Sequence, residues 1–340
     1  MALEKITSLD VARRAGVSQL AVSRVFTPCA SASAATIEKV RRAASELGYR
    51  PNRMASAMIT GKSRIIGLVV AYLDNQFYPV ALERLSNALQ AKGYHVLVFT
   101  APNAQERVGE IVAELMDYQV DGIITASVAM TNDLTERCAA AGIPVVMFNR
   151  GQDGRDLSSV TSANTAGGRK VADFLAGQGY TRIAHISGWQ GASTGRDRQA
   201  GFLAGLAEAG LTPTALIDGM YDRDTAAAAA RDLMDSATPP DAIFVGNDHM
   251  AFAVLDTLRY DLGLSVPGDV AIVGYDDVPL AAWPAFDLTT VRQPVNQMVD
   301  TTVDILLTQI ADPDAPARRV EIDGPLIIRG SAPTTQGQTP

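Results

Sequence analysis

The sequence predicts an α/β protein with a small helical head at its N-terminus, followed by two doubly wound lobes built on parallel sheets. The chain has 340 residues, which is too many for one ordinary hydrophobic core and suggests two or three domains. The formal net charge of −8 divides unevenly between a basic N-terminal segment and an acidic remainder. Beyond residue 64, short apolar runs alternate with helical patterns, as in sheets covered by helices on both faces.

The composition excludes several classes of protein. With 47% hydrophobic and 19% charged residues, the chain is typical of globular proteins. It holds no apolar run of about 18 residues or more, so we expect no membrane-spanning segment. The first residues include Glu4 and Asp10 and no long apolar core, so we expect no export signal and a cytoplasmic protein. Cys29 and Cys138 form no disulfide framework or metal-ligand cluster, and we expect free thiols, no metal and no cofactor.

The basic segment comprises residues 1–64. It holds 11 Lys and Arg against 4 Asp and Glu, a charge of +7, whereas the rest of the chain holds 18 against 33, a charge of −15. A small basic module on an acidic body is typical of polyanion binding combined with a second task. Because a solvated surface can carry the same charge, the motifs must decide between the two interpretations.

The first helix of the head is expected to begin near Thr7, whose hydroxyl would bond a first-turn N–H. Leu9, Ala12 and Ala15 fall near one face of this short helix. Gly16 follows at the position where a left-handed conformation is easiest for glycine.

A second short helix follows this glycine-containing turn. Ser18 is expected to cap it, and Val22 and Val25 point inward at i, i+3 spacing. The residues left facing outward are Gln19, Leu20, Ser23 and Arg24. Two short helices joined in this way form a helix-turn-helix, whose second helix enters the major groove of DNA.

A third helix is expected over 34–47, capped by Ser33 and ended by Gly48 and Pro51. Its predicted buried stripe comprises Ile37, Val40, Ala44 and Leu47. The stretch 52–60 has a weak helical pattern, which we expect to become ordered on DNA.

The body alternates strands and helices. The predicted strands are Ile65–Val70, Val96–Phe99, Ile123–Thr125, Pro144–Phe148, Ile183–Ile186, Ala242–Val245 and Val270–Val273. Helical patterns cover 79–92, 104–117, 165–178, 199–209, 223–235 and 294–310. The remaining length is sufficient for two such lobes, and ligands of open α/β sheets bind beyond the carboxyl ends of the strands. We therefore expect a ligand cleft between the lobes.

Polar and aromatic side chains follow several of the predicted strands. They are Asp74, Asn75, Phe77, Tyr78, Asn149, Arg150, Arg196, Arg198, Asn247, Asp248, Asp276 and Asp277, with both Arg196 and Arg198 in an expected STGRDR loop. Amide, carboxylate and guanidinium groups beside aromatic rings suit a hydroxyl-rich ligand.

The motifs resemble those of the LacI/GalR family of transcription regulators. In the head these are DVA-x-x-AGVS, VSR and LGY-x-PN-x-x-A, and in the body GNDHMA and VGYDD, so the resemblance covers nearly the whole chain. The family's sensor domain is similar to periplasmic sugar-binding proteins. The resemblance therefore implies two lobes of periplasmic-binding-protein type and a ligand-controlled regulator, a repressor of carbohydrate or sugar-acid metabolism genes, associated with the nucleoid when it is bound to DNA.

The same resemblance implies which residues contact DNA. They are Thr7, Ser18, Gln19, Leu20, Ser23, Arg24, Asn52, Arg53 and Met58. Gln19 can donate to and accept from an adenine edge, Leu20 suits a thymine methyl, and Arg24 suits a base or a phosphate. Met58 stands where the family usually has leucine as a minor-groove wedge, so ordinary linker packing is the alternative for this residue.

For the ligand, the resemblance implies contacts by Phe77, Tyr78, Asn149, Arg198, Tyr221, Asn247 and Asp276. Asp248 and Asp277 are interpreted as structural residues that cap or orient loops. Many sugar-responsive members have aspartate where Asn149 stands. This difference, with Arg196 and Arg198 close together, favours an anionic ligand such as a sugar acid or phosphate over a neutral sugar.

The expected domains are a helix-turn-helix domain over 1–51, a hinge helix over 52–62, a first lobe of 63–162 with 291–322, and a second lobe of 163–290 with 323–333. Residues 334–340 are expected to form a flexible tail. Because that tail has no leucine heptads, we expect a homodimer on near-palindromic double-stranded operator DNA and no coiled-coil tetramer.

Other functions fit the residues less well. Gly61-Lys62-Ser63 resembles the end of a phosphate loop, but it precedes a strand and Ser56 replaces the required glycine. No G-x-S-x-G or G-x-G-x-x-G motif is present in a suitable position, and His95, His185 and His249 are too scattered for a metal site. A sugar-transport component would have no use for the basic head. The sequence therefore argues against an enzyme.

Overall fold

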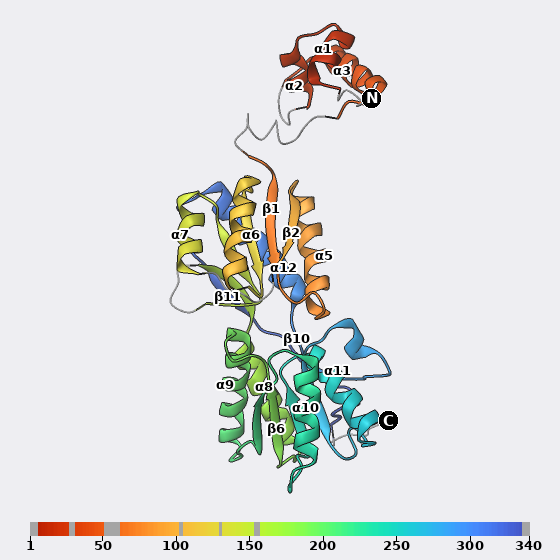
Figure 1. Ribbon diagram of the computed structural model, residues 1–340, viewed down its shortest axis with the longest axis vertical. Helices are drawn as coiled ribbons and strands as arrows, with labels where there is room; N and C mark the ends of the chain where they lie inside the picture. Colours follow the sequence, from red (N-terminus) through yellow and green to blue (C-terminus); the bar gives the residue numbers. More distant parts are fainter. Residues whose placement is uncertain are drawn as a thin grey trace. The chain divides into compact units, whose positions relative to one another are not determined.

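In the computed structural model, the residues described are 6–26, 31–50, 62–101, 105–128, 131–152 and 157–334. The chain divides into two compact units, residues 1–64 and residues 65–340, which are described separately (Figure 1).

The described residues of the first unit, the head, form three helices: α1 (Ser8–Ala15), α2 (Gln19–Phe26) and α3 (Ala34–Leu47). Its buried core consists of Val11, Ala12, Val22, Val40, Ala43 and Ala44. Gly16 adopts a left-handed conformation with φ of 67° and ends α1 as expected. Ser33 Oγ accepts a hydrogen bond from Thr36 N at the start of α3. The three predicted helices are therefore present.

Two details of α1 differ from expectation. Leu9 is 44% exposed, and Val11 takes its place in the core because Val11, Ala12 and Ala15 share the inward face. The Thr7 hydroxyl donates to Asp10 Oδ2 at 2.6 Å, and the Thr7 backbone N–H donates to the same oxygen at 2.9 Å. The cap is therefore made largely by the aspartate carboxylate, which suits the positive end of a helix dipole.

The first lobe of the second unit has one parallel six-stranded sheet in the order β11-β5-β4-β3-β1-β2. Its strands are β1 (Ile65–Val70), β2 (His95–Thr100), β3 (Gly122–Ala126), β4 (Val145–Phe148), β5 (Ser158–Ser162) and β11 (Arg319–Ile322). Its helices are α5 (Phe77–Ala91), α6 (Gln105–Asp117), α7 (Asn132–Ala140) and α12 (Val295–Ala311).

The second lobe repeats this plan, with a six-stranded sheet in the order β12-β10-β9-β8-β6-β7 in which the β10–β12 pair is antiparallel. Its strands are β6 (Ile183–Ser187), β7 (Ala215–Asp218), β8 (Ala242–Val245), β9 (Ala271–Asp276), β10 (Thr289–Arg292) and β12 (Leu326–Ile327). Its helices are α8 (Asn164–Gly177), α9 (Ser193–Glu208), α10 (Arg223–Met234) and α11 (Asp248–Asp256).

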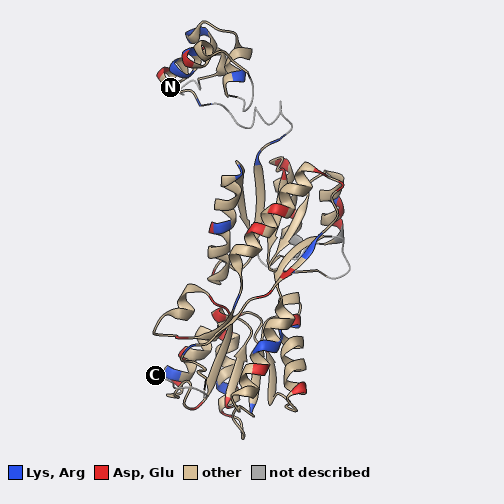
Figure 2. Cartoon of the chain, turned by 180° about the vertical axis from the view of Figure 1, so that it is seen from behind, with Lys and Arg blue, Asp and Glu red and all other residues tan. Residues whose placement is uncertain are grey.

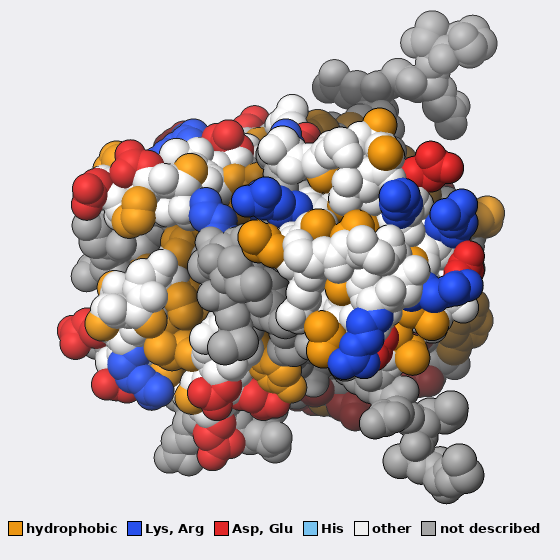
Figure 3. Space-filling model, turned by 90° about the horizontal axis from the view of Figure 1, so that it is seen from above, with side chains coloured by type: hydrophobic (Ala, Val, Ile, Leu, Met, Phe, Trp, Pro, Cys, Tyr) orange, Lys and Arg blue, Asp and Glu red, His pale blue; other side chains and the backbone are white. Residues whose placement is uncertain are grey.

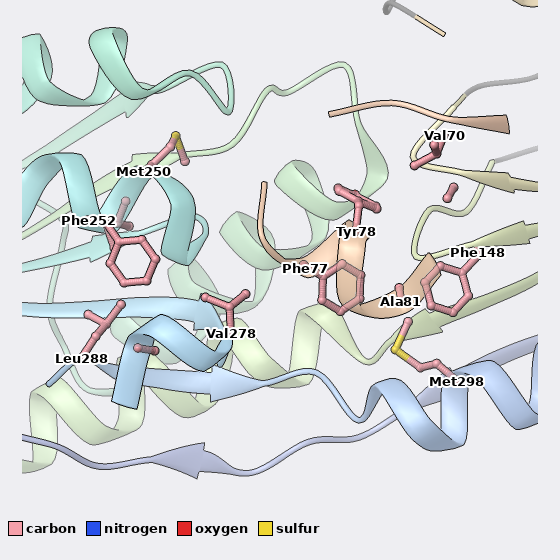
Figure 4. Packing of buried hydrophobic residues seen from close by; sticks show 14 of the residues in the cluster. Val70, Phe77, Tyr78, Ala81, Phe148, Met250, Phe252, Val278, Leu288 and Met298 are labelled. Atoms are coloured by element: carbon pink, nitrogen blue, oxygen red, sulfur yellow. The ribbon is translucent and has the colours of Figure 1, made fainter. Parts of the chain in front are cut away.

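Both faces of each sheet are covered. In β1, alternate residues Ile66, Leu68 and Val70 belong to a core shared with α5, whereas Val69 belongs to a separate core with α6 and α7. The first of these cores continues into the second lobe (Figure 4). This shared core includes Phe77 and Phe148 of the first lobe together with Phe252 and Leu288 of the second. No helix among the described residues is long and apolar enough to cross a membrane.

All seven predicted strands are present, but five further strands, β5, β7, β10, β11 and β12, were not expected. The helix expected over 199–209 begins at Ser193, so the expected STGRDR loop is the first part of α9.

The domain boundary at residue 291 is wrong by two residues, because Val291 and Arg292 pair with β9 in the second sheet. Within residues 157–334, the chain passes between the sheets three times, near Ala163, Pro294 and Gly324.

Candidate nucleic-acid interface and ligand cavity

The outward face of α2 carries the residues predicted to contact DNA bases. Leu20 is 62% exposed, Gln19 and Arg24 are exposed, and Ser23 is partly buried. Gln19 Nε2 donates to Ser8 Oγ at 2.9 Å, which connects this face of α2 to α1. Gln19 and Leu20 lie in the first turn of α2, the part of a groove-binding helix that approaches base edges, and Ser23 and Arg24 lie one turn further along.

Thr7 and Ser18 act as helix caps in this structure. Thr7 bonds Asp10 as described, and Ser18 Oγ accepts from Ala21 N at 3.2 Å at the start of α2. The other three residues predicted to contact DNA, Asn52, Arg53 and Met58, lie outside the described residues, as do 52–61 of the expected hinge helix.

The head exposes much of its positive charge. Arg13 and Arg14 form surface ion pairs with Asp10 and Glu46. The other exposed cations of the three described helices and of residue 50 are Arg24, Lys39, Arg41, Arg42 and Arg50. Basic side chains are visible over the head in Figure 3, and Figure 2 shows the contrast with the acidic residues of the lobes. Such a surface attracts the phosphates of a nucleic acid.

The second unit contains a cavity between the carboxyl ends of strands from both lobes, with about 380 Å³ of space when the part open to solvent is included. It is lined by Tyr72, Asp74, Asn75, Tyr78, Ser127, Asn149, Thr194, Arg198, Tyr221, Asn247, His249 and Asp276. Six of the seven predicted ligand contacts are in this lining. The position agrees with the general rule for open α/β sheets.

Arg198 of α9 reaches the cavity from the second lobe with a side chain that is 3% exposed. Its Nη1 donates to Gly246 O at 2.7 Å and its Nε to Asn164 Oδ1 at 2.9 Å. The guanidinium lies over the ring of Tyr275, 3.7 Å from the centroid. Burial acts to lower the pKa of Arg198, but Tyr221 and Asp276 more than offset it and raise the pKa. Arg198 is therefore a fixed cation in the cavity wall.

Asp276 ends β9 and faces Arg198, with 3.6 Å between Asp276 Oδ1 and Arg198 Nη1. Gln293 Nε2 donates to Asp276 Oδ1 at 2.7 Å. Burial raises the pKa of Asp276, and the nearby Arg198 acts in the opposite direction. The cavity thus holds an anion and a cation side by side.

Three tyrosines supply hydroxyls and apolar ring faces. Burial raises the pKa of Tyr78 to about 12, and it also raises the pKa of Tyr72 and of Tyr221. Their hydroxyls therefore stay protonated. Tyr221 packs its ring where a Cβ on Gly188 would lie 2.0 Å away, so the glycine after β6 makes room for the ring. Tyr221 also donates to Thr194 Oγ1 at 2.8 Å.

Two asparagines were predicted to bind the ligand, and both line the cavity. Asn149 follows β4 in a left-handed conformation with φ of 63°, and its Nδ2 donates to the Tyr78 hydroxyl at 3.1 Å. Asn149 Oδ1 is buried and has no hydrogen-bond partner among the described residues. Asn247 caps α11, since its Oδ1 accepts from Met250 N at 2.9 Å. Asn149 thus offers an acceptor that a ligand hydroxyl can use.

Phe77 is the predicted contact that the cavity does not include. It stacks on Phe148 with centroids 6.2 Å apart and is 4% exposed within the core, as Figure 4 shows. Arg196 is exposed and is not in the lining, so the two arginines do not act together on one ligand.

The predicted structural roles of Asp248 and Asp277 are confirmed. Asp248 accepts from Val278 N and Thr290 Oγ1, and Asp277 accepts from Arg292 and Arg329.

The prediction omitted several lining residues. Asp74 and Asn75 were noticed after β1 but not chosen, and Tyr72, Ser127, Thr194 and His249 were not chosen at all. His249 directly follows the Asn-Asp pair that was recognised, and its Nε2 lies 3.5 Å from Asp74 Oδ2 of the other lobe. The position directly after a strand or at a helix start is the signal that these residues share.

A helix-turn-helix head joined to a two-lobed body with a polar cavity defines the class of ligand-responsive DNA-binding transcription regulators. Residues 7–52 match the family described as "Bacterial regulatory proteins, lacI family", and residues 172–332 match "Periplasmic binding protein-like domain". The chain belongs to the lacI family of bacterial regulatory proteins and is a transcription regulator, not an enzyme.

Relatives and a solved structure agree with this membership. The chain is 30% identical to the HTH-type transcriptional repressor PurR of Vibrio atlanticus, over 96% of this chain and 99% of the relative. It is also 30% identical to the ribose operon repressor of Escherichia coli, over the same shares of the two chains. The structure of the lac repressor dimer bound to operator and the anti-inducer ONPF superposes with a TM-score of 0.87 and 26% identity, covering 97% of this chain and 100% of the other.

Proposed function

We propose that this regulator is a repressor that binds a near-palindromic operator as a homodimer and changes its DNA affinity when a neutral monosaccharide occupies the cavity. The observation that carries the proposal is the composition of the cavity between the two lobes: hydroxyls, amides, and one ion pair whose two members both belong to the second lobe. The genes it controls would serve carbohydrate metabolism, and the protein would act in the cytoplasm, on the nucleoid.

The outward face of α2 supports the DNA half of the proposal. Gln19, Leu20, Ser23 and Arg24 would face base edges, with Thr7 and Ser18 near phosphates, while Asn52, Arg53 and Met58 of the linker would reach the minor groove. A dimer would place two such helices in successive major grooves, which is why the operator would be near-palindromic.

The charge of the cavity favours a neutral ligand over a sugar acid. Arg198 is already matched by Asp276 at 3.6 Å, and Asp74 adds a further carboxylate to the lining. An anionic ligand would meet two carboxylates and one arginine that is already paired. A sugar hydroxyl, in contrast, can donate to Asp276 or Asn149 and accept from Arg198 or a tyrosine.

The aromatic part of the cavity lining suits one sugar ring. The rings of Tyr72, Tyr78 and Tyr221 would pack against the apolar face of the sugar. The ribose operon repressor, a relative at 30% identity, makes D-ribose the first compound to test.

Ligand control follows if the ligand binds one lobe arrangement better than the other. A ligand in the cavity would contact both lobes, so it would favour the closed arrangement and change the spacing of the paired heads. A coupling of about 1–3 kcal/mol would change operator affinity about 5- to 150-fold.

The test begins with selection of binding sites from random double-stranded DNA by the full-length protein. The selected site is then titrated by gel shift with and without D-ribose, other neutral monosaccharides and the matching sugar acids, with isothermal titration calorimetry on the same panel. We expect a selected near-palindrome and a response to a neutral monosaccharide. No selected sequence, or a response to acids alone, would contradict the proposal.

A further inference from the structure

Arg150 makes a contact between the lobes that does not involve the three chain crossings. The residue follows β4 in the first lobe, and its side chain is buried, at 5% exposure of the residue. Its Nη1 donates to Ser127 O at 3.1 Å, within the first lobe. Its Nη2 donates to Gly191 O at 3.1 Å, in the loop before α9 of the second lobe. The guanidinium also lies over the ring of Trp189 of the second lobe, 5.2 Å from the centroid.

A second contact beside it joins the same two segments. Gly151 N donates to Ser193 Oγ at 3.0 Å, and Ser193 begins α9. The segment 150–151 of the first lobe is therefore held against the segment 189–193 of the second. Since α9 also carries Arg198, the contact lies next to the element that supplies the cation of the cavity.

The charge of Arg150 makes this contact easy to reverse. Among the described residues, Arg150 has no carboxylate within ion-pair distance; its contacts are carbonyl oxygens and an aromatic ring. Burial lowers the pKa of Arg150, and the groups that act against this are the hydroxyls of Tyr78, Tyr72 and Tyr221. A buried guanidinium loses solvation, which the two hydrogen bonds and the ring only partly replace. Separation of the lobes would return the group to water.

We propose that Arg150 is a positioning residue for ligand binding: a latch that holds the two lobes closed around the cavity by joining Ser127 of the first lobe to Gly191 and Trp189 of the second. This role rests on the proposed ligand-dependent closure and goes further, because the latch acts before a ligand arrives. It sets the fraction of molecules that are already closed. Apparent ligand affinity scales with that fraction.

Trp189 provides a reporter of the latch. The chain has two tryptophans, and Trp283 is 56% exposed. Trp283→Phe therefore leaves Trp189 as the single source of tryptophan fluorescence. Acrylamide quenching and small-angle X-ray scattering would be measured on this background with no ligand and no DNA, and again after Arg150→Met, which keeps an unbranched apolar side chain and removes the guanidinium with its donors.

We expect Arg150→Met to shift the population from closed to open by about tenfold or more, the change expected when a hydrogen bond to a charged group is lost. Trp189 quenching and the radius of gyration should both rise. Arg150→Lys should give a smaller rise in both, because its ammonium keeps the charge and can donate to one of the two carbonyls; it also serves as the second variant if Arg150→Met does not fold. In the direct ligand test, D-ribose or any sugar shown to bind should lose affinity in the order wild type, Arg150→Lys, Arg150→Met.

The matched control is Arg259→Met. Arg259 also donates to two backbone carbonyls, Ala285 O at 2.5 Å and Phe286 O at 3.5 Å, but all three residues lie in the second lobe. We expect this variant to leave Trp189 quenching and the radius of gyration unchanged. The latch is refuted if Arg150→Met leaves both unchanged, or if Arg259→Met raises both equally. Because these readings need no sugar and no operator, failure of the proposed function would be seen separately.

Discussion

Arg198 and Asp276 form an ion pair that is closed to water, with 3.6 Å between Nη1 and Oδ1 and each side chain 3% exposed. The arginine comes from α9 and the aspartate from the end of β9. A single buried charge is costly, whereas a pair fixed by further hydrogen bonds is tolerated. The pair gives the cavity a donor and an acceptor at one place, which is what a hydroxyl requires.

Arg198→Ala should abolish the ligand response and leave operator binding intact, because the head is a separate unit. Loss of one partner leaves Asp276 buried and uncompensated, and the free energy of unfolding of the lobes should fall by about 3–5 kcal/mol. Calorimetry, gel shift and urea unfolding would measure the three effects. The control is Arg196→Ala on the exposed side of the same helix, which should resemble wild type. Wild-type sugar affinity in Arg198→Ala would contradict the assignment.

Gln19→Ala should relax the base preference at one operator position, by about 1–3 kcal/mol if the amide makes a bidentate contact. Its control is Ser8→Ala, which removes the present partner of Gln19 without changing the side chain that would face DNA. Binding-site selection with each variant would measure the effect. An unchanged preferred sequence in Gln19→Ala would show that Gln19 does not read a base.

Gly168→Ala and Gly177→Ala should have opposite effects, although both residues are in α8. A Cβ on Gly168 would lie 2.0 Å from the backbone oxygen of Arg198, whereas a Cβ on Gly177 would meet nothing within 4 Å. The first change forces α8 and α9 apart and should lower the free energy of unfolding by about 3 kcal/mol. The second should raise it by about 0.4–1 kcal/mol. Urea denaturation would compare them; equal effects would refute the close helix contact.

His185 should make the second lobe sensitive to mild acid. The ring lies in the core against Phe244, and burial lowers the pKa of His185 to about 4. Above pH 6.5 the ring is neutral in both states. As the pH falls from about 6.5 to 4, the unfolded chain takes up a proton that the folded protein refuses, and stability falls by about 3 kcal/mol.

His185→Leu should lack this component of the acid response. Asp248 and Asp276, whose pKa values are raised by burial, act in the opposite direction but are present in both proteins, so they cancel in the comparison. Urea unfolding at pH 7 and pH 4.5 would measure the difference. Parallel losses of stability in the two proteins would contradict the assignment to His185.

The predicted strands were found because each contains a short apolar run, and all of them except the edge strand β2 are also buried. Strand β5 was missed for the opposite reason: its sequence, SSVTS, is polar, yet all five residues are buried. Ser158 Oγ accepts from Gln309 Nε2 and Arg318 N, two groups more than 150 residues away in sequence. Such long-range hydrogen bonds satisfy the polar side chains of a buried strand, and they cannot be inferred from the hydropathy of the sequence.

The cavity was predictable to the level of segments but not of single side chains. Phe77 and Tyr78 are adjacent residues at the start of α5. Because successive residues of a helix point in different directions, Phe77 packs in the core and Tyr78 lines the cavity. Arg196 and Arg198 differ in the same way on α9, where a loop had been expected. The direction of each side chain depends on where its helix begins, which the sequence pattern located only within several residues.

The linker from the head enters the second unit at β1, and β1 pairs with both β2 and β3 in parallel register over most of its length. A force along the linker therefore acts along β1 and loads its hydrogen bonds to β2 and to β3 at the same time, in shear. A strand at the edge of a sheet would instead lose its hydrogen bonds one after another. Tension between DNA and the sensor would therefore reach the centre of the first sheet through β1 and would pass to the second lobe through the three crossings near Ala163, Pro294 and Gly324.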